Sequence, residues 1–180
     1  MAATIQEQKV TGTTMAMFLD YNPETGAFYR KLKTGPNSYP GEEITCLNDE
    51  GYIIVTMMGA RLRAHRLAWV WMTGNWPKED IDHINGNRAD NRFINLRGAT
   101  RSQNLQNSGM RSYNKTGYKG VHFCNQRQKY VAQIRINKKA TCLGRFETLE
   151  EASAVRIAAE KRFYGEFAGS NDRPCFEKDR

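Results

Sequence analysis

Four polar residues in the middle of the chain, Asp82, His83, Asn95 and Asn104, have the side-chain types needed for chemistry on a phosphate ester. A neutral histidine beside a carboxylate can take a proton from water near neutral pH. Asp82 offers an anionic oxygen and Asn104 a neutral one, a set that suits a hard divalent cation such as Mg²⁺. Such a cation can bind a phosphate oxygen and neutralise charge on the leaving oxygen. Because neighbouring strand residues point to opposite faces, Asp82 and His83 need a bulge or an irregular strand end to point inward together.

The elements expected to position these residues form a compact ββα unit. Residues 81–84 have the character of a short strand, and the Asn-Gly dipeptide that follows is typical of a turn. A second short strand should precede the helix. Thr100 and Gln103 have the spacing of a capping box, which predicts a helix that begins at Arg101 and carries Asn104 near its start.

The residues before this unit predict a small antiparallel β region and then a helix. Turn sequences precede residues 27–30 and 52–57, and both segments have strand character. Residues 58–61 should turn the chain again. Apolar residues at helical spacing predict a helix over residues 64–73, which a glycine ends.

The residues after the unit predict a sheet with one helix behind it. A polar linker precedes three strand-like segments, at 119–123, 129–136 and 140–146. Thr148 and Glu151 form a second capping box, and the helix should end at Gly165. Four residues of this helix should pack against the sheet: Ala152, Val155, Ala159 and Phe163.

Composition narrows the class of protein. The chain of 180 residues is 39% hydrophobic, which is enough for a core and excludes wholesale disorder. No apolar run approaches the roughly 20 residues of a membrane span, and no secretory leader is visible, so we expect a cytoplasmic protein with no membrane partner. The four cysteines are far apart and form no closely spaced pair, which predicts reduced thiols used mostly in packing and no structural zinc.

The positive charge is concentrated in the C-terminal part. The formal net charge is +8, and the segment from Arg111 to Arg145 holds nine basic residues and no acidic one. Apolar residues of the predicted strands alternate with these cations, so the charge should lie on a folded surface. Such a surface is typical of proteins that bind nucleic-acid phosphates. On charge alone, a basic surface without a partner is the alternative.

Several blocks of the middle region resemble the HNH homing endonucleases that phages often carry. They are His65-Arg66-Leu67-Ala68-Trp69, Gly74-Asn75-Trp76-Pro77, Asp82-His83-Ile84-Asn85-Gly86-Asn87, Asp90-Asn91-Arg92, Asn95-Leu96-Arg97 and Ser102-Gln103-Asn104. The resemblance implies a ββα-metal nuclease in which His83 is the general base and Asn95 orients it through its side-chain carbonyl. It implies that Asp82 and Asn104 hold the metal, with Mg²⁺ expected and Mn²⁺ as the alternative. Asn104 stands where many relatives have a histidine.

The C-terminal part resembles the Apetala-type DNA-binding domain, a three-stranded sheet packed on one helix. The resemblance lies in Tyr118-Lys119-Gly120-Val121, Tyr130-Val131-Ala132-Gln133-Ile134-Arg135, Leu143-Gly144-Arg145-Phe146 and Thr148-Leu149-Glu150-Glu151-Ala152. It implies that one sheet face enters the major groove. The residues that would face DNA are Lys119, His122, Arg127, Lys129, Gln133, Arg135 and Arg145. Ala140 and Cys142 replace a contact arginine and a contact tryptophan of the plant domains.

We therefore expect an α+β protein with five segments. They are a β-rich extension (1–61), the nuclease core (62–108), a linker (109–117), the DNA-binding domain (118–168) and a tail (169–180). The predicted activity is metal-dependent hydrolysis of double-stranded DNA by a monomer that nicks one strand, in the host cytoplasm if the gene belongs to a phage. The alternatives are a non-catalytic, sequence-specific DNA-binding regulator on a nuclease scaffold, and a protein that binds structured RNA.

Overall fold

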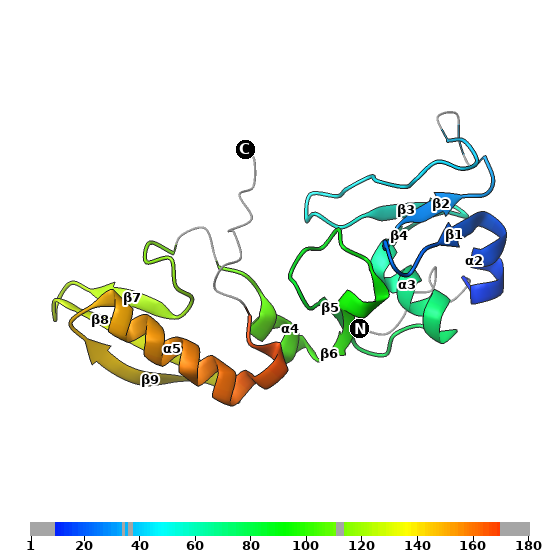
Figure 1. Ribbon diagram of the computed structural model, residues 1–180. Coiled ribbons are helices and arrows are strands. Elements are labelled where there is room, and N and C mark those ends of the chain that lie inside the picture. Colours follow the sequence, from blue (N-terminus) through cyan, green and yellow to red (C-terminus); the bar gives the residue numbers. More distant parts are fainter. Residues whose placement is uncertain (1–9, 34, 36–37, 111–113, 170–180) are drawn as a thin grey trace. The chain divides into compact units, whose positions relative to one another are not determined.

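The computed structural model describes residues 10–33, 35, 38–110 and 114–169, whose elements are labelled in Figure 1. The chain divides into two compact units, residues 1–104 and residues 105–180. Parts of three predicted segments lie outside the described residues: the start of the N-terminal extension, residues 111–113 of the linker, and the tail from residue 170, with Cys175.

The N-terminal unit begins with a helix and two antiparallel hairpins. These elements are α2 (Gly12–Phe18), β1 (Leu19–Tyr21), β2 (Phe28–Arg30), β3 (Ile54–Met57) and β4 (Ala60–Arg63). β1 pairs with β2 and β3 pairs with β4, which confirms the predicted antiparallel β region. Helix α2 was not predicted, because glycine and threonine have low helix propensity; the Thr11 side chain caps it and Met15 anchors it in the core. β4 occupies residues where only a turn was predicted.

Helix α3 (Ala64–Thr73) has the predicted bounds and ends at Gly74, whose φ of 73° is left-handed. Its buried face belongs to one hydrophobic core with both hairpins and with the strands that follow it. The largest members of this core include Met15, Leu19, Phe28, Val55, Met57, Leu67, Val70, Ile81 and Leu96. The N-terminal extension and the predicted nuclease core therefore share a single core.

Two strands and a helix follow α3 in the predicted order. They are β5 (Asp80–His83) and β6 (Leu96–Ala99), with the short helix η1 (Phe93–Asn95) before β6, and then α4 (Arg101–Asn107). β5 and β6 pair antiparallel without a register shift, so of the two predicted alternatives, a bulge or an irregular strand end, the bulge is absent; His83 is the last residue of its strand. The capping box is confirmed, because the backbone N–H of Gln103 donates to the Thr100 hydroxyl and that of Thr100 donates to the Gln103 side chain.

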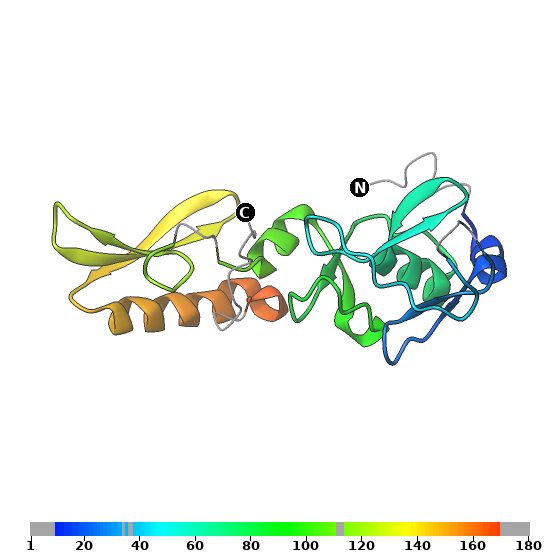
Figure 2. The same ribbon diagram turned by 90° about the horizontal axis from the view of Figure 1, so that it is seen from above.

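The C-terminal unit is a three-stranded antiparallel sheet with a helix along one face, seen in both Figure 1 and Figure 2. Its elements are β7 (Val121–Cys124), β8 (Lys129–Ile136), β9 (Lys139–Phe146), α5 (Leu149–Tyr164) and η2 (Gly165–Phe167). The strand order is β7-β8-β9, with a register irregularity at Ala132 and Gln133. The Thr148 hydroxyl accepts from the backbone N–H of Glu151 at 3.2 Å, which confirms Thr148 as the N-cap of α5.

The predicted buried face of α5 is only partly correct. Ala152 and Ala159 are buried, but Val155 is 37% exposed and Phe163 is 46% exposed. The buried face instead contains an ion pair, in which the Arg156 guanidinium lies 2.9 Å from the Glu160 carboxylate. The sequence prediction failed because it assigned charged residues to the solvent face, as helical amphipathicity usually requires.

Two further observations bear on composition. Cys46 and Cys142 are exposed, so the prediction that the cysteines serve mostly in packing is wrong for both; Cys124 is half-buried. Among the residues that the structure describes, no helix is long and apolar enough to cross a membrane.

Candidate active site

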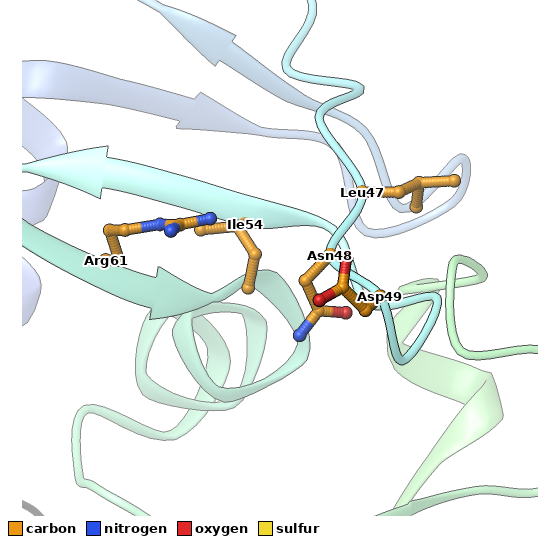
Figure 3. Close-up of a pocket in the computed structure, with 5 residues that line it drawn as sticks. All are labelled: Leu47, Asn48, Asp49, Ile54 and Arg61. Carbon is orange, nitrogen blue, oxygen red and sulfur yellow. The ribbon is translucent and has the colours of Figure 1, made fainter.

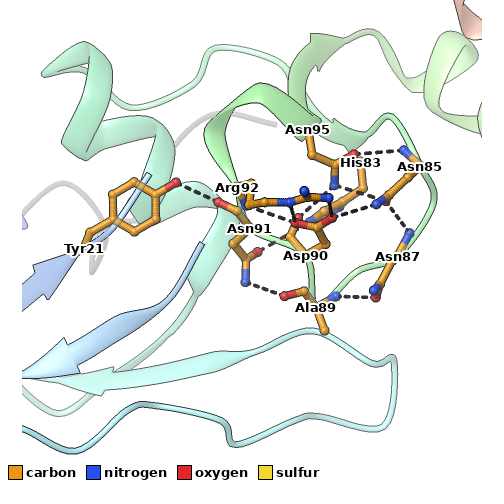
Figure 4. Close-up of polar contacts among 9 residues, drawn as sticks. All are labelled: Tyr21, His83, Asn85, Asn87, Ala89, Asp90, Asn91, Arg92 and Asn95. Carbon is orange, nitrogen blue, oxygen red and sulfur yellow. Dashed lines mark hydrogen bonds and ion pairs between the residues drawn. The ribbon is translucent and has the colours of Figure 1, made fainter. Parts of the chain in front are cut away.

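His83 lies at the end of β5, where an asparagine-rich loop begins (Figure 4). The side chain is 4% exposed. Its Nε2 atom is 3.5 Å from Oδ1 of Asn91, a residue of the same loop that is 1% exposed. The Asn91 amide group donates to the carbonyl oxygen of Ala89 at 3.1 Å, so its Oδ1 is the atom directed at His83. Asn91 is thus a site residue whose role was not predicted from the sequence.

Two aromatic rings pack around His83. The His65 ring meets it edge-on at 5.0 Å between centroids, and Tyr52 lies 5.0 Å from His65 and 6.0 Å from His83. His65 is itself buried in α3. Burial lowers the pKa of His83, an effect that the hydrogen bond to Asn91 and the negative charge of Asp82 only partly oppose. His83 is therefore neutral near pH 7, the form that a general base requires.

Asn95 holds the loop and does not orient His83. Its side-chain carbonyl accepts from the backbone N–H of Asn85 at 3.0 Å. Its amide group donates to Oδ1 of Asn85 at 3.0 Å and to the carbonyl oxygen of Asp90 at 2.9 Å. The expected hydrogen bond between His83 and the side-chain carbonyl of Asn95 is not made; that oxygen accepts from the backbone of Asn85 instead. Asn95 is nevertheless buried at the centre of the loop, directly before β6.

An ion pair closes the other side of the loop. Two nitrogens of Arg92 donate to the Asp90 carboxylate, Nε at 2.8 Å and a terminal nitrogen at 2.5 Å. The Asn85 amide donates to the same carboxylate at 2.7 Å. The hydrogen bond from Arg92 holds the pKa of Asp90 below its usual value, so this carboxylate is charged at neutral pH. The loop thus keeps one conformation through side-chain contacts and not through regular secondary structure.

Asp82 is paired with an arginine. It lies opposite Arg97 in the β5–β6 register, and its Oδ2 is 2.9 Å from Nε and 2.8 Å from a terminal nitrogen of that arginine. Asp82 is 4% exposed. Because β5 is regular, alternation directs Asp82 and His83 to opposite faces of the hairpin.

The predicted metal ligands offer oxygen atoms of the right kind. Asp82 supplies a carboxylate and Asn104, half-buried in α4, supplies an amide whose side chain makes no hydrogen bond to any described residue. Such a hard-oxygen pair fits a cation that keeps several water and phosphate ligands. Within the described part of the chain, no group of three or more His, Cys, Asp or Glu side chains converges on one point, so an all-protein metal cage is not formed there.

In the C-terminal unit, the face of the sheet away from α5 carries most of the predicted DNA-facing residues. Strand alternation and the cross-strand register define this outer sheet face, which includes His122, Val131, Gln133, Arg135, Ala140, Cys142 and Arg145. None of these residues is acidic, and all but Val131 are exposed. Arg127, in the turn between β7 and β8, is exposed as well. Ala140 lies opposite Arg135, and Cys142 opposite Gln133.

Two of the predicted DNA-facing residues, Lys119 and Lys129, already have partners within the C-terminal unit. The Lys119 ammonium donates to the carbonyl oxygens of Leu105, Gln106 and Ser108 at 2.8–3.2 Å, where it caps the carboxyl end of α4. Three such bonds use all three N–H groups of a lysine, so the placement does not support a DNA contact by Lys119. Lys129 lies 2.7 Å from the Glu147 carboxylate, which offsets its charge.

An open pocket lies at the β3–β4 hairpin (Figure 3). Its lining consists of Leu47, Asn48, Asp49, Ile54 and Arg61. The side-chain Oδ1 of Asn48 accepts from the backbone N–H groups of Glu50 and Tyr52, which shows that this side chain shapes the turn. No predicted site residue lines this pocket.

One protein-family model matches the middle of the chain. Residues 62–106 match the family model of the HNH endonuclease. The matched segment contains Asp82, His83, Asn95 and Asn104, and it supports a nuclease of the HNH type that acts on DNA. No curated protein and no solved structure matched the chain. The C-terminal sheet lies outside the matched segment.

Proposed function

We propose that the protein is a metal-dependent HNH endonuclease of the homing type that hydrolyses phosphodiester bonds in double-stranded DNA. One observation supports this most directly: within the segment matched to HNH endonucleases, His83 is a buried, neutral histidine at the end of β5, directly after Asp82 in the chain. DNA binding alone requires neither a histidine base nor a hard-oxygen pair, which disfavours the regulator alternative.

His83 would take a proton from the attacking water. Asn91 and the His65 ring restrict the orientation of its imidazole, and the loop held by Asn95 and the Asp90–Arg92 pair keeps those contacts in place. Asp82 and Asn104 would hold the divalent cation, with Mg²⁺ as the expected ion and Mn²⁺ as the alternative. When bound, the cation would supply neutralisation of charge on the phosphate and the leaving oxygen.

The C-terminal unit would supply affinity and register on the DNA. We propose that residues 118–168 form an Apetala-type domain whose outer sheet face enters the major groove. The proposed contacts are His122, Arg127, Gln133, Arg135 and Arg145, with Lys129 at the edge, while Lys119 is removed from this set. The segment 62–108 would form the ββα-metal core, and 109–117 the linker between the two domains.

The test is cleavage of supercoiled plasmid carrying the target site, with and without Mg²⁺. We expect His83→Ala to lower the cleavage rate at saturating DNA by about 10²–10⁴-fold and to leave DNA affinity nearly unchanged, since a general base acts in the transition state. His122→Ala is the matched control: this exposed histidine should affect affinity but not the rate at saturation. Full activity in His83→Ala would overturn the assignment, and DNA binding without any cleavage would favour the regulator.

The product also tests the proposed stoichiometry. One set of catalytic residues per chain can align with one scissile phosphate at a time, so we propose a monomer that nicks one strand. Open circles should then appear before linear DNA. Linear product formed directly, at low enzyme concentration, would show that two subunits act together.

A further inference from the structure

The oxygen atom that Asn91 presents to His83 has a consequence for the proton on the imidazole ring. A carbonyl oxygen only accepts hydrogen bonds, so the contact at 3.5 Å is favourable only when Nε2 carries the proton. The lone pair is then on Nδ1, so a general base in this tautomer would act through that nitrogen. The Asn91 amide cannot rotate to present its N–H₂ group without losing the bond to Ala89.

Asn91 is itself held from the N-terminal hairpin. The Tyr21 hydroxyl, at the end of β1, donates to the backbone carbonyl oxygen of Asn91 at 2.7 Å, and the bond is buried. The Tyr21 ring stacks on Phe28 of the paired strand at 4.6 Å between centroids. Burial raises the pKa of Tyr21 to about 12, so the hydroxyl stays a donor at neutral pH. Figure 4 shows the line of contacts from Tyr21 through Asn91 to His83.

The turn between β1 and β2 fixes the same backbone a second time. Gly26 has a φ of +78°, and a Cβ there would lie 2.4 Å from the backbone nitrogen of Arg92 and 2.6 Å from the carbonyl carbon of Asn91. The backbone N–H of Phe93 donates to the carbonyl oxygen of Pro23 in this turn at 3.1 Å. Such a close approach of two backbones is open only to glycine.

We infer that Asn91 is a positioning residue that selects the Nε2-protonated tautomer of His83, and that Tyr21 and the β1–β2 turn hold Asn91 in place. The N-terminal hairpin, which lies outside the segment matched to HNH endonucleases, is then part of the nuclease site. The effect on cleavage rests on the proposed function, whereas the tautomer of His83 does not.

The direct test is the imidazole ¹⁵N spectrum of the full-length protein. The chain has three histidines, and His65→Gln and His122→Gln assign their signals by elimination. We expect His83 of the unsubstituted protein to carry its proton on Nε2. Asn91→Leu, which has a similar shape but no acceptor, should shift His83 toward a mixture of tautomers. Asn91→Asp keeps an acceptor and should preserve the Nε2–H form. A wild-type His83 protonated on Nδ1, or a tautomer that Asn91→Leu leaves unchanged, would overturn the inference.

Cleavage gives the second readout. Asn91→Leu should lower kcat by about 10–100-fold, as loss of a residue that orients a functional histidine typically does, with little change in KM. Asn91→Asp should restore most of that loss. Tyr21→Phe keeps the ring packing and provides a milder variant should Asn91→Leu unfold; it should show a smaller loss of kcat and a partial tautomer shift. Tyr29→Phe, in the paired strand, is the control and should match the wild type.

The two readouts separate failure of the relay, by which we mean the contacts from Tyr21 through Asn91 to His83, from failure of the proposed function. A tautomer that responds to Asn91→Leu in a protein that cleaves no DNA would support the relay and refute the nuclease. An active nuclease whose kcat and tautomer are both insensitive to Asn91 and Tyr21 would refute the relay alone.

Discussion

The Arg156–Glu160 pair beneath the C-terminal sheet gives a sharp prediction about stability. Both side chains are buried, at 3% and 2% exposure, and they lie one helical turn apart in α5. Removing one member of a buried ion pair leaves the other charge uncompensated and typically costs about 3–5 kcal/mol. A unit that spans residues 105–180 has a free energy of unfolding of roughly 4–11 kcal/mol. We therefore expect Arg156→Met to remove a large part of that stability.

The double variant separates charge from packing. Arg156→Met combined with Glu160→Leu replaces the pair by apolar groups, which is usually neutral or stabilising by about 1–4 kcal/mol relative to the ion pair. The double variant should therefore be far more stable than Arg156→Met alone. The coupling between the two substitutions, taken from a double-mutant cycle, measures the cost of the unpaired charge.

Urea unfolding followed by hydrogen exchange of the β8 amides measures the stability of this unit. All three tryptophans lie in residues 69–76, so tryptophan fluorescence reports the N-terminal unit and serves as an internal control. The fluorescence transition should not move in any of these variants.

Burial raises the pKa of Glu160 more than Arg156 and Lys119 lower it. A carboxyl whose pKa is raised by folding contributes most stability below its unfolded pKa, and that contribution is lost as the pH rises through the folded value. The unit should thus lose stability as the pH rises from about 4.5, and Glu160→Gln should abolish that slope. If Glu160→Gln is as stable as the wild type at pH 7, the carboxyl is neutral in the folded protein and the ion-pair reasoning is refuted.

Other predictions concern the turn, the basic face and the helix cap. Gly26→Ala should destabilise the N-terminal unit by more than the roughly 1–2 kcal/mol that a left-handed backbone costs an alanine, because its Cβ would also meet the backbone of Asn91 and Arg92. Gly12→Ala, where a Cβ would enter open space, should not have this effect. Urea unfolding monitored by tryptophan fluorescence distinguishes the two variants. Arg135→Ala should weaken DNA binding and reduce the slope of log affinity against log salt by about 1, measured by fluorescence anisotropy. Lys119→Met should leave that slope unchanged and destabilise the protein by about 0.3–2 kcal/mol; a reduced slope would show that Lys119 contacts phosphate.

The elements with strong local signals were predictable from the sequence. Helix α3 has its predicted bounds, and the hydroxyls of Thr100 and Thr148 cap their helices as expected, because these features depend on residues a few positions apart. The buried face of α5 was only partly predicted. Its position depends on Arg156 and Glu160 neutralising each other inside the unit, a tertiary effect that hydrophobic periodicity does not report.

In the candidate site, too, the residues with a local sequence signal were predicted and the tertiary contacts were not. The sequence named His83, Asp82, Asn95 and Asn104, and the HNH match covers all four. It did not show that Asn95 would bind the loop backbone while Asn91 faced His83. An asparagine-rich loop allows many hydrogen-bond patterns, and only the folded backbone selects one. The Tyr21 contact joins residues far apart in the chain and left no local signal.

The shared core of the N-terminal unit determines how much of the chain must be kept together when the HNH segment is moved into another protein. Residues 62–106 form a segment near the length below which chains rarely fold without metals or disulfides, about 40 residues. In this protein the buried face of α3 is covered by side chains from α2 and the two hairpins, such as Met15, Phe28 and Val55. Cutting the chain at the family boundary would expose that face to water. A chimaeric nuclease built from this chain should therefore carry residues 10–107, through the end of α4, as one cassette.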